Sequence, residues 1–127
     1  MPTAVTDGVR VTVEAVYLPD RSCPEEHSYA FAYLVTIENQ GHTRVQLRRR
    51  HWIITDGNGK VEEVEGPGVV GQQPILDRGE THRYTSGAIL PTPVGTMEGS
   101  YEMHEAGGRV FRARIPRFAL QVPGVVQ

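Results

Sequence analysis

Hydrophobic and polar residues alternate along most of the chain, and this period of two predicts β-strands. The first such run covers Val9–Val13, where valines occupy every second position, as in a strand with one buried face. The apolar positions then shift by one, to Val16 and Leu18. Because an inserted residue changes which face of a strand is buried, we expect a bulge near Glu14–Ala15.

The strongest strand signal is the segment Tyr29–Ile37. Large apolar residues occupy every second position of this segment, and the residues between them are mostly small or apolar as well. A strand that is apolar on both faces is expected either in a sheet covered on both sides or at the centre of a sheet covered once. A turn is predicted after it, at Asn39-Gln40-Gly41.

The strand pattern that follows changes parity in its middle. Val45 and Leu47 open it, whereas the later apolar residues Trp52 and Ile54 stand at positions of the opposite parity. One extra residue explains this change, so we expect a second bulge between Arg48 and His51.

Turn signals and short strand patterns alternate over the rest of the chain. Asp-Gly, Asn-Gly and Gly-Gly pairs predict hairpin turns at residues 56–59 and 107–108, because these residues accept a positive φ at low cost. Further strands are expected over residues 61–64, 81–86, 97–103, 110–115 and 118–122, with loops at 19–24 and 89–95 and an interruption at Pro116. About eight short strands without a helical period predict an all-β antiparallel β-sandwich, with a barrel as the alternative.

Length and composition restrict the class of protein. With 127 residues, we expect a single domain over 1–127. A formal net charge of −2 does not favour nucleic acid or an anionic membrane as a partner, and the longest apolar stretch, Ala30–Val35, is too short to span a bilayer. Cys23 is the one cysteine and the N-terminal residues lack a signal-peptide pattern, so we expect a cytoplasmic protein.

The glycine motif Gly66-x-Gly68-x-x-Gly71 is the first candidate binding site. In a dinucleotide-binding fold such glycines join a strand to a helix whose amides hold a pyrophosphate, but Val69-Val70 and Pro74 argue against a helix here. A glycine loop can also bind an anion through its backbone amides. Alternatively, the glycines permit tight bends or close packing of strands, which is the interpretation we favour.

The densest group of positive charges is the segment Arg48–Trp52. Arginine side chains bind phosphates well, and alternation places Arg48 and Arg50 on one face of the strand and Arg49 on the other. We expect Arg49 to keep an edge soluble and Trp52 to lie in the core. The candidate phosphate-binding set is therefore Gly66, Gly68, Gly71, Arg48 and Arg50.

Catalytic and metal-binding motifs are absent from the sequence pattern. The five histidines show no metal-ligand spacing, and the segment Asp56–Val61 lacks the third ligand and the turn glycine of a calcium loop. Thr85-Ser86-Gly87 is not a nucleophile elbow. We predict a non-enzymatic protein with no catalytic residues, no metal ligands and no cofactor.

Several segments, in order along the chain, resemble the ApaG family. They are Arg50–Asp56, Gly66–Pro74, Tyr84–Gly87, Pro93–Tyr101 and Ile115–Leu120. The resemblance covers about residues 7–122, which would form the core of the domain. It implies a fibronectin type III-like, immunoglobulin-like β-sandwich, in agreement with the strand pattern.

The resemblance also narrows the expected function. Bacterial members are single-domain proteins, often encoded beside a diadenosine tetraphosphate hydrolase and associated with cobalt resistance and magnesium efflux. Similar domains of eukaryotic F-box and DNA-polymerase-interacting proteins look like protein-interaction modules. We therefore expect a module with a protein partner; the alternative is binding of pyrophosphate or a dinucleoside polyphosphate at Gly66–Gly71, with Arg48 or Arg50 supplying charge. Direct binding of a divalent cation and a homodimer formed through an unpaired edge strand are further hypotheses.

Overall fold

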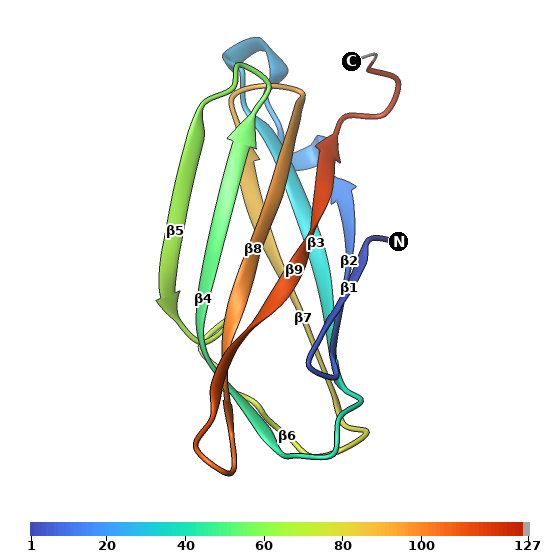
Figure 1. Cartoon of the computed structure of the whole chain (residues 1–127). Coiled ribbons are helices and arrows are strands. Elements are labelled where there is room, and N and C mark those ends of the chain that lie inside the picture. The colour runs from blue at the N-terminus through green and yellow to red at the C-terminus, as the bar shows by residue number, and fades with distance from the viewer. Residues whose placement is uncertain (126–127) are drawn as a thin grey trace.

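The computed structural model describes residues 1–125 and shows two antiparallel sheets that face one another (Figure 1). The first sheet has the order β1 (Thr3–Thr6), β2 (Val9–Tyr17), β3 (Tyr29–Asn39) and β7 (Thr81–Leu90). The second has the order β5 (Val61–Pro67), β4 (Val45–Asp56), β8 (Val94–Glu105) and β9 (Val110–Gln121), and the short β6 (Ile75–Leu76) pairs with the start of β4. Two separate sheets confirm the predicted sandwich and exclude the barrel.

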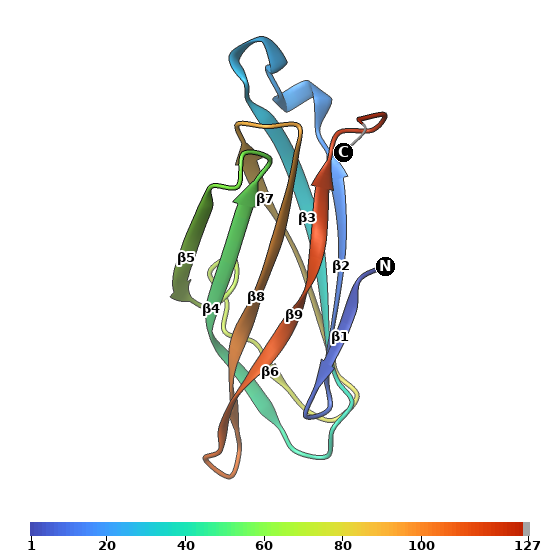
Figure 2. The same cartoon turned by 45° about the horizontal axis from the view of Figure 1, so that its top comes forward.

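The sandwich is closed along one side and open along the other, as the two views in Figures 1 and 2 show. On the closed side β9 packs against β2 and β1, and the Arg114 amide donates a 3.0 Å hydrogen bond to the Thr6 hydroxyl. On the open side β7 and β5 are the last strands of their sheets. Among residues 1–125, no strand joins these two edges.

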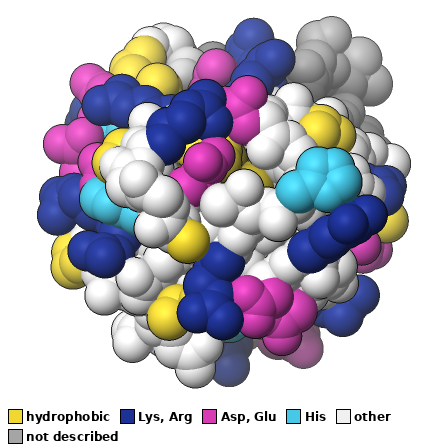
Figure 3. Space-filling view, turned by 60° about the horizontal axis from the view of Figure 1, so that its bottom comes forward, with side chains coloured by type: hydrophobic (Ala, Val, Ile, Leu, Met, Phe, Trp, Pro, Cys, Tyr) yellow, Lys and Arg dark blue, Asp and Glu magenta, His cyan; other side chains and the backbone are white. Residues whose placement is uncertain are grey.

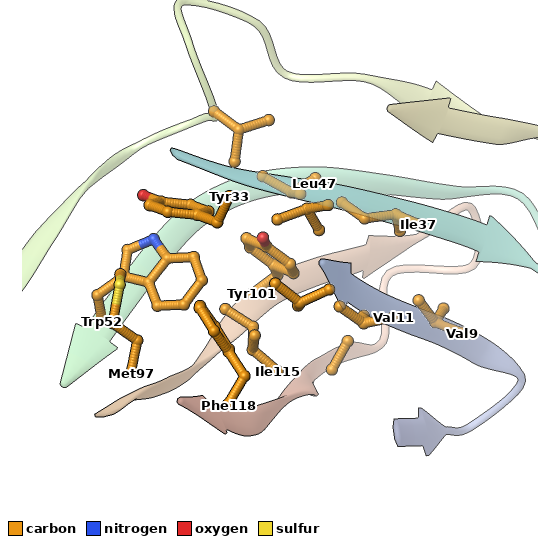
Figure 4. Close-up of a cluster of buried hydrophobic side chains, with 14 of the residues drawn as sticks. Val9, Val11, Tyr33, Ile37, Leu47, Trp52, Met97, Tyr101, Ile115 and Phe118 are labelled. Atoms are coloured by element: carbon orange, nitrogen blue, oxygen red, sulfur yellow. The ribbon is translucent and has the colours of Figure 1, made fainter. Parts of the chain in front are cut away.

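One cluster of apolar side chains fills the space between the sheets (Figure 4). Every second residue of each long strand points into it, as the period of two predicts. The largest fully buried members are Tyr101, Phe31, Ile37, Leu47, Met97, Met103, Ile115 and Leu120. β2 and β7 flank β3, which therefore lies inside its sheet. The other sheet covers only one face of β3.

The predicted bulge near Glu14–Ala15 is wrong. β2 pairs with β3 without a register shift, from Val9 opposite Asn39 to Tyr17 opposite Phe31. The inward face therefore continues through Ala15 and Tyr17, and Val16 stays on the outer face with 56% of its surface exposed. The error came from taking an apolar residue as a buried one, although apolar atoms make up much of any protein surface.

The predicted change of parity in the next strand is confirmed. The register of β4 against β8 shifts between Leu47 and Arg49, so the extra residue is Arg48, at the start of the predicted range. A second shift was not predicted: opposite Met97–Gly99, β9 has two residues between its inward residues Ile115 and Phe118, one more than a regular ladder needs. Pro116 lies in this bulge and does not interrupt β9, since a bulged residue needs no ladder hydrogen bond from its nitrogen.

The remaining differences concern the ends of elements. β7 extends to Leu90 and β8 begins at Val94, so the predicted loop at 89–95 shrinks to 91–93. The short β1 was not predicted. The predicted loop at 19–24 contains one 3₁₀ turn, Pro19–Arg21, and the start of a second, Pro24–Glu26. Within the described residues, no helix is long and apolar enough to cross a membrane.

Candidate functional site

A cleft of about 380 Å³ lies on the open side of the sandwich, between β7 and the strands β4 and β5. Arg50, Tyr33 and Ser86 line one end of this cleft, and Asp56, Lys60 and Glu62 line the other. The wall between them is largely apolar and includes Trp52, Ile54, Val64, Ala88, Leu90 and Met97. This combination of an apolar wall with a few polar groups is typical of a binding cleft.

The two sides of the cleft are built differently. β4 contributes every second residue, Arg50, Trp52, Ile54 and Asp56, so it presents one face. β7 contributes the consecutive residues Ser86–Leu90, which point alternately to both faces of its sheet. The cleft is therefore bordered by the backbone edge of β7. We call the longer segment Tyr84–Leu90, which includes these residues, the open edge of β7.

Trp52 forms the rigid base of the cleft. Its ring lies 5.2 Å from that of Tyr33 and 5.9 Å from that of Phe118, with the rings steeply inclined (Figure 4). Such edge-to-face pairs add about 0.5–1.5 kcal/mol each beyond the burial of their surface. Trp52 is buried, so it belongs to the core, as predicted, and at the same time lines the cleft.

Arg50 is the half-buried cation of the cleft. It pairs with Gly66 in the β4–β5 ladder, and one guanidinium nitrogen donates hydrogen bonds of 2.8 Å to the Pro67 carbonyl and 3.0 Å to the Gly68 carbonyl. A Cβ at position 66 would lie 2.9–3.1 Å from the guanidinium group. Gly66 thus leaves the space that Arg50 occupies. No carboxylate among residues 1–125 forms an ion pair with Arg50.

The charge of Arg50 acts on three tyrosine hydroxyls, those of Tyr33, Tyr84 and Tyr101. Tyr84 and Tyr101 share a hydrogen bond between their hydroxyls, and Tyr33 lies beside Ser86. Burial raises the pKa of Tyr33, and the Ser86 hydroxyl and the Arg50 charge only partly offset this. Burial likewise raises the pKa of Tyr84 and Tyr101. All three phenols therefore stay neutral at physiological pH and can donate hydrogen bonds.

The glycine motif forms a tight turn whose amides are mostly used within the chain. The Gly68 amide donates to the Arg48 carbonyl at 2.9 Å, and Val69 and Gln72 exchange two backbone hydrogen bonds, of 2.8 and 3.0 Å. A Cβ at position 68 would overlap the Gln72 carbonyl oxygen. Towards Arg50 the loop presents carbonyl oxygens. The anion-binding interpretation of this loop stays a prediction.

Val70, at the tip of this turn, is strained. Its φ is +46° and that of Gly71 is +75°, as in a type I′ turn, and a β-branched residue rarely adopts such a φ. We expect Val70→Asn to raise the free energy of unfolding by about 1 kcal/mol, because Asn-Gly suits this turn. Chemical denaturation measures the change. Val61→Asn, at another exposed valine, is the control; no gain at position 70 would contradict the strain.

The structure brings together only part of the predicted site. Gly66, Gly68 and Arg50 lie in contact, as described above. Arg48 lies on the bulge, exposed, with its Nε bound to Gln46 at 2.8 Å, and Gly71 stands at the turn tip with open space around it. Sequence reasoning missed Tyr33 and Ser86. The available signal was Arg50 itself, a charged residue with the same parity as the inward-facing Trp52.

The outer face of the first sheet carries an exposed apolar patch beside the open edge of β7. In the strand register, Ala32 on β3 stands between Val16 on β2 and Gly87 on β7. Leu34 and Ile89 lie on either side of this row. Val16 is 56% exposed and Ile89 70% exposed. Ala32 and Gly87 are small, so the patch is flat. A contiguous apolar patch of this kind often marks a protein-interaction surface.

Elsewhere the surface is mixed in charge. Figure 3 shows one end of the molecule, where basic and acidic side chains are interspersed and hydrophobic side chains are scattered. Arg44 pairs with Asp77 at 2.6 Å and Arg109 with Asp7 at 2.7 Å. Among the described residues no three His, Cys, Asp or Glu side chains gather as a metal site would require.

The fold and cleft together define a fibronectin type III-like sandwich with one open side. Residues 19–105 match the family model described as the ApaG domain, and the chain belongs to this family. It is 55% identical over 118 residues to Protein ApaG of Pseudomonas aeruginosa strain LESB58, covering 93% of this chain and 94% of that protein. It is 54% identical over 123 residues to Protein ApaG of Rhodospirillum centenum, covering 97% and 95%.

A solved structure has the same fold. A crystal structure of an ApaA protein from Bordetella pertussis matches with a TM-score of 0.88 and 48% sequence identity, and the match covers 98% of each chain. This likeness confirms the predicted fold class. The names of these relatives state no reaction, ligand or partner.

Proposed function

We propose that this chain is a non-catalytic module that binds a partner protein by accepting an extended segment of the partner as an additional strand on β7. The open edge of β7 is the observation that carries the proposal. It pairs on one side with β3, and its seven residues from Tyr84 to Leu90 are uncharged and contain no proline. Such an edge offers unpaired backbone groups to another chain.

The other edges of the two sheets are protected. β1 has only four residues. β5 carries Glu62, Glu63 and Glu65 and ends at a proline, and β9 carries three arginines and the Pro116 bulge. Short strands, charges, prolines and bulges are the usual ways in which proteins prevent pairing at an edge. β7 lacks these features over Tyr84–Leu90, which supports its use as a binding edge.

The surroundings of this edge define the chemistry of the partner segment. Side chains of an added strand would point alternately into the cleft, over Trp52 and Ile54, and onto the outer patch, beside Ile89. The partner segment should therefore have apolar residues on both of its faces. Any role of this protein in cobalt resistance or magnesium efflux would then run through that partner, in the cytoplasm.

Binding of pyrophosphate or a dinucleoside polyphosphate at Gly66–Gly71 is the second candidate function. The uncompensated charge of Arg50 beside Gly66 favours it. The use of the Gly68, Val69 and Gln72 amides within the turn weighs against it, because an anion needs free N–H donors. We therefore rank it below strand addition.

Lysines on the open edge of β7 are expected to weaken partner binding. Thr85 and Ile89 are exposed, so Thr85→Lys with Ile89→Lys should leave the fold intact while opposing strand addition by charge and bulk. We expect at least about a tenfold loss of affinity for a partner isolated with the native chain. Val61→Lys with Val110→Lys, two exposed valines on other strands, is the matched control.

Hydrogen exchange of the complex locates the contact. Protection of the amides of Tyr84–Leu90 by the bound partner is the expected result. Protection confined to another strand would contradict the proposal. If protection at β7 instead rises with the concentration of the chain alone, and sedimentation shows a dimer, the occupant is a second copy of this chain.

A further inference from the structure

Arg50 is the feature of the cleft that the packing of this chain leaves without a counter-ion. Its side chain is half-buried, and within residues 1–125 its hydrogen bonds go to two backbone carbonyls, with no carboxylate partner. No residue from 1 to 125 accepts a hydrogen bond from the other guanidinium N–H groups. A partly buried cation without a paired anion is disfavoured unless a ligand supplies the anion, so the arrangement indicates a binding site.

The groups beside Arg50 suit a carboxylate. The neutral Tyr33 phenol and the Ser86 hydroxyl line the same end of the cleft, and both can donate a hydrogen bond. A guanidinium with one or two hydroxyl donors is a common arrangement for a carboxylate group. The opposite end of the cleft, with Asp56 and Glu62 around Lys60, carries an excess of negative charge.

The spacing of the cleft residues matches that of a strand. Arg50, Trp52 and Ile54 lie on one face of β4 at every second position, about 7 Å apart. Inward side chains of a strand added to β7 would recur with the same period. The residue facing Arg50 would then be followed, two and four positions along, by residues facing Trp52 and Ile54.

We propose that Arg50, with Tyr33 and Ser86, selects an Asp or Glu in the partner segment, and that apolar residues two and four positions from it occupy the cleft over Trp52 and Ile54. This inference rests on strand addition to β7 as the proposed function. It gives the partner segment a pattern, one acidic residue and two apolar residues on a single face of an extended chain.

Selection from a random peptide library tests this pattern, because it requires no known partner. Eight-residue peptides displayed on phage would be selected on the intact native chain. We expect Asp or Glu at one position to be enriched about tenfold over Asn or Gln, since hydrogen bonds between charged groups are stronger than those to a neutral amide. Apolar residues should be enriched two and four positions away. Synthetic versions should change the fluorescence of Trp52, which is the one tryptophan of the chain.

Variants of Arg50 separate its charge from the fold. Arg50→Gln removes the charge, keeps a polar side chain on β4 and should lose the preference for Asp or Glu, whereas Arg50→Lys should keep part of it. Arg49→Gln is the matched control, because Arg49 lies one position away, opposite Glu102 in the β4–β8 register, and neither residue lines the cleft. It should behave like the native chain.

The outcomes distinguish the two proposals. Two results would overturn the role of Arg50 and leave strand addition standing. In the first, the selected peptides protect the β7 amides but show no preference for Asp or Glu. In the second, they protect these amides and the preference for Asp or Glu persists in Arg50→Gln. Selected peptides that leave the β7 amides unprotected would overturn strand addition, and an empty selection would do so as well. If inorganic phosphate at low millimolar concentration displaces the peptides while acetate at the same concentration does not, the site prefers a free phosphate, and recognition of a peptide carboxylate is overturned.

Discussion

Gly99→Ala is expected to lower the free energy of unfolding by about 3 kcal/mol or more. Gly99 lies opposite Trp52 in the register of β4 and β8, where the two backbones approach closely. An added Cβ would overlap the His51 carbonyl oxygen and lie 3.1 Å from the Trp52 Cα. These are backbone atoms that cannot rotate away, so the pairing of two central strands would have to shift.

Chemical denaturation of purified Gly99→Ala measures this loss. The control is Gly107→Ala, because a Cβ at position 107 meets nothing within 4 Å and the φ there is not positive. The control should stay within about 0.5 kcal/mol of the native chain. A loss below about 1 kcal/mol for Gly99→Ala would mean that the β4–β8 backbones are further apart than the structure places them.

Gly68→Ala should be the most damaging of the three alanine substitutions in the glycine motif, with a loss of about 2–4 kcal/mol. Two effects add at this position. The φ of +62° disfavours any Cβ by about 1–2 kcal/mol, and the Cβ would also overlap the Gln72 carbonyl oxygen that accepts the Val69 amide. The turn that follows β5 would therefore have to open.

The other two motif glycines set the scale for this prediction. Gly71→Ala should lose about 1–2 kcal/mol, because its φ is positive but the space around it is open. Gly66→Ala meets only the flexible Arg50 side chain, so its main effect should be to displace Arg50 from the cleft. Equal losses at positions 66, 68 and 71 in thermal and chemical unfolding would contradict this order.

This ranking also bears on the anion-binding alternative. A Gly68→Ala protein that fails to bind pyrophosphate would show only that the turn is damaged. The informative measurement is a titration of the native chain with pyrophosphate, followed at the amide resonances of Gly66–Gly71. Saturable shifts there would revive the alternative, and unchanged spectra at millimolar pyrophosphate would leave these glycines with the structural role that we favour.

Much of the fold was accessible from the sequence because it depends on local alternation. Tyr29–Ile37 was recognisable as a central strand, and the parity change from Leu47 to Trp52 located the Arg48 bulge. Alternation fails where an apolar residue is exposed for another reason. Val16 suggested a bulge, yet it lies on the outer face within the patch beside β7.

The candidate site was only partly accessible. Arg50 and Gly66 were identified as a basic residue and a motif glycine, and the structure pairs them across β4 and β5. Tyr33 and Ser86 were missed because they come from the other sheet, and no spacing in the sequence links them to Arg50. Their proximity arises from packing.

The sequence by itself therefore determined the local features of this protein: the strands, most turns, the all-β class and, through its motifs, the family. These depend on residues within a few positions of each other, whose side-chain period and turn chemistry act locally. Only the tertiary structure decided which side of the sandwich stays open, which edge is left without protection and which residues face Arg50. Those properties depend on how the two sheets stack, and that stacking is a sum of contacts between residues far apart in the chain.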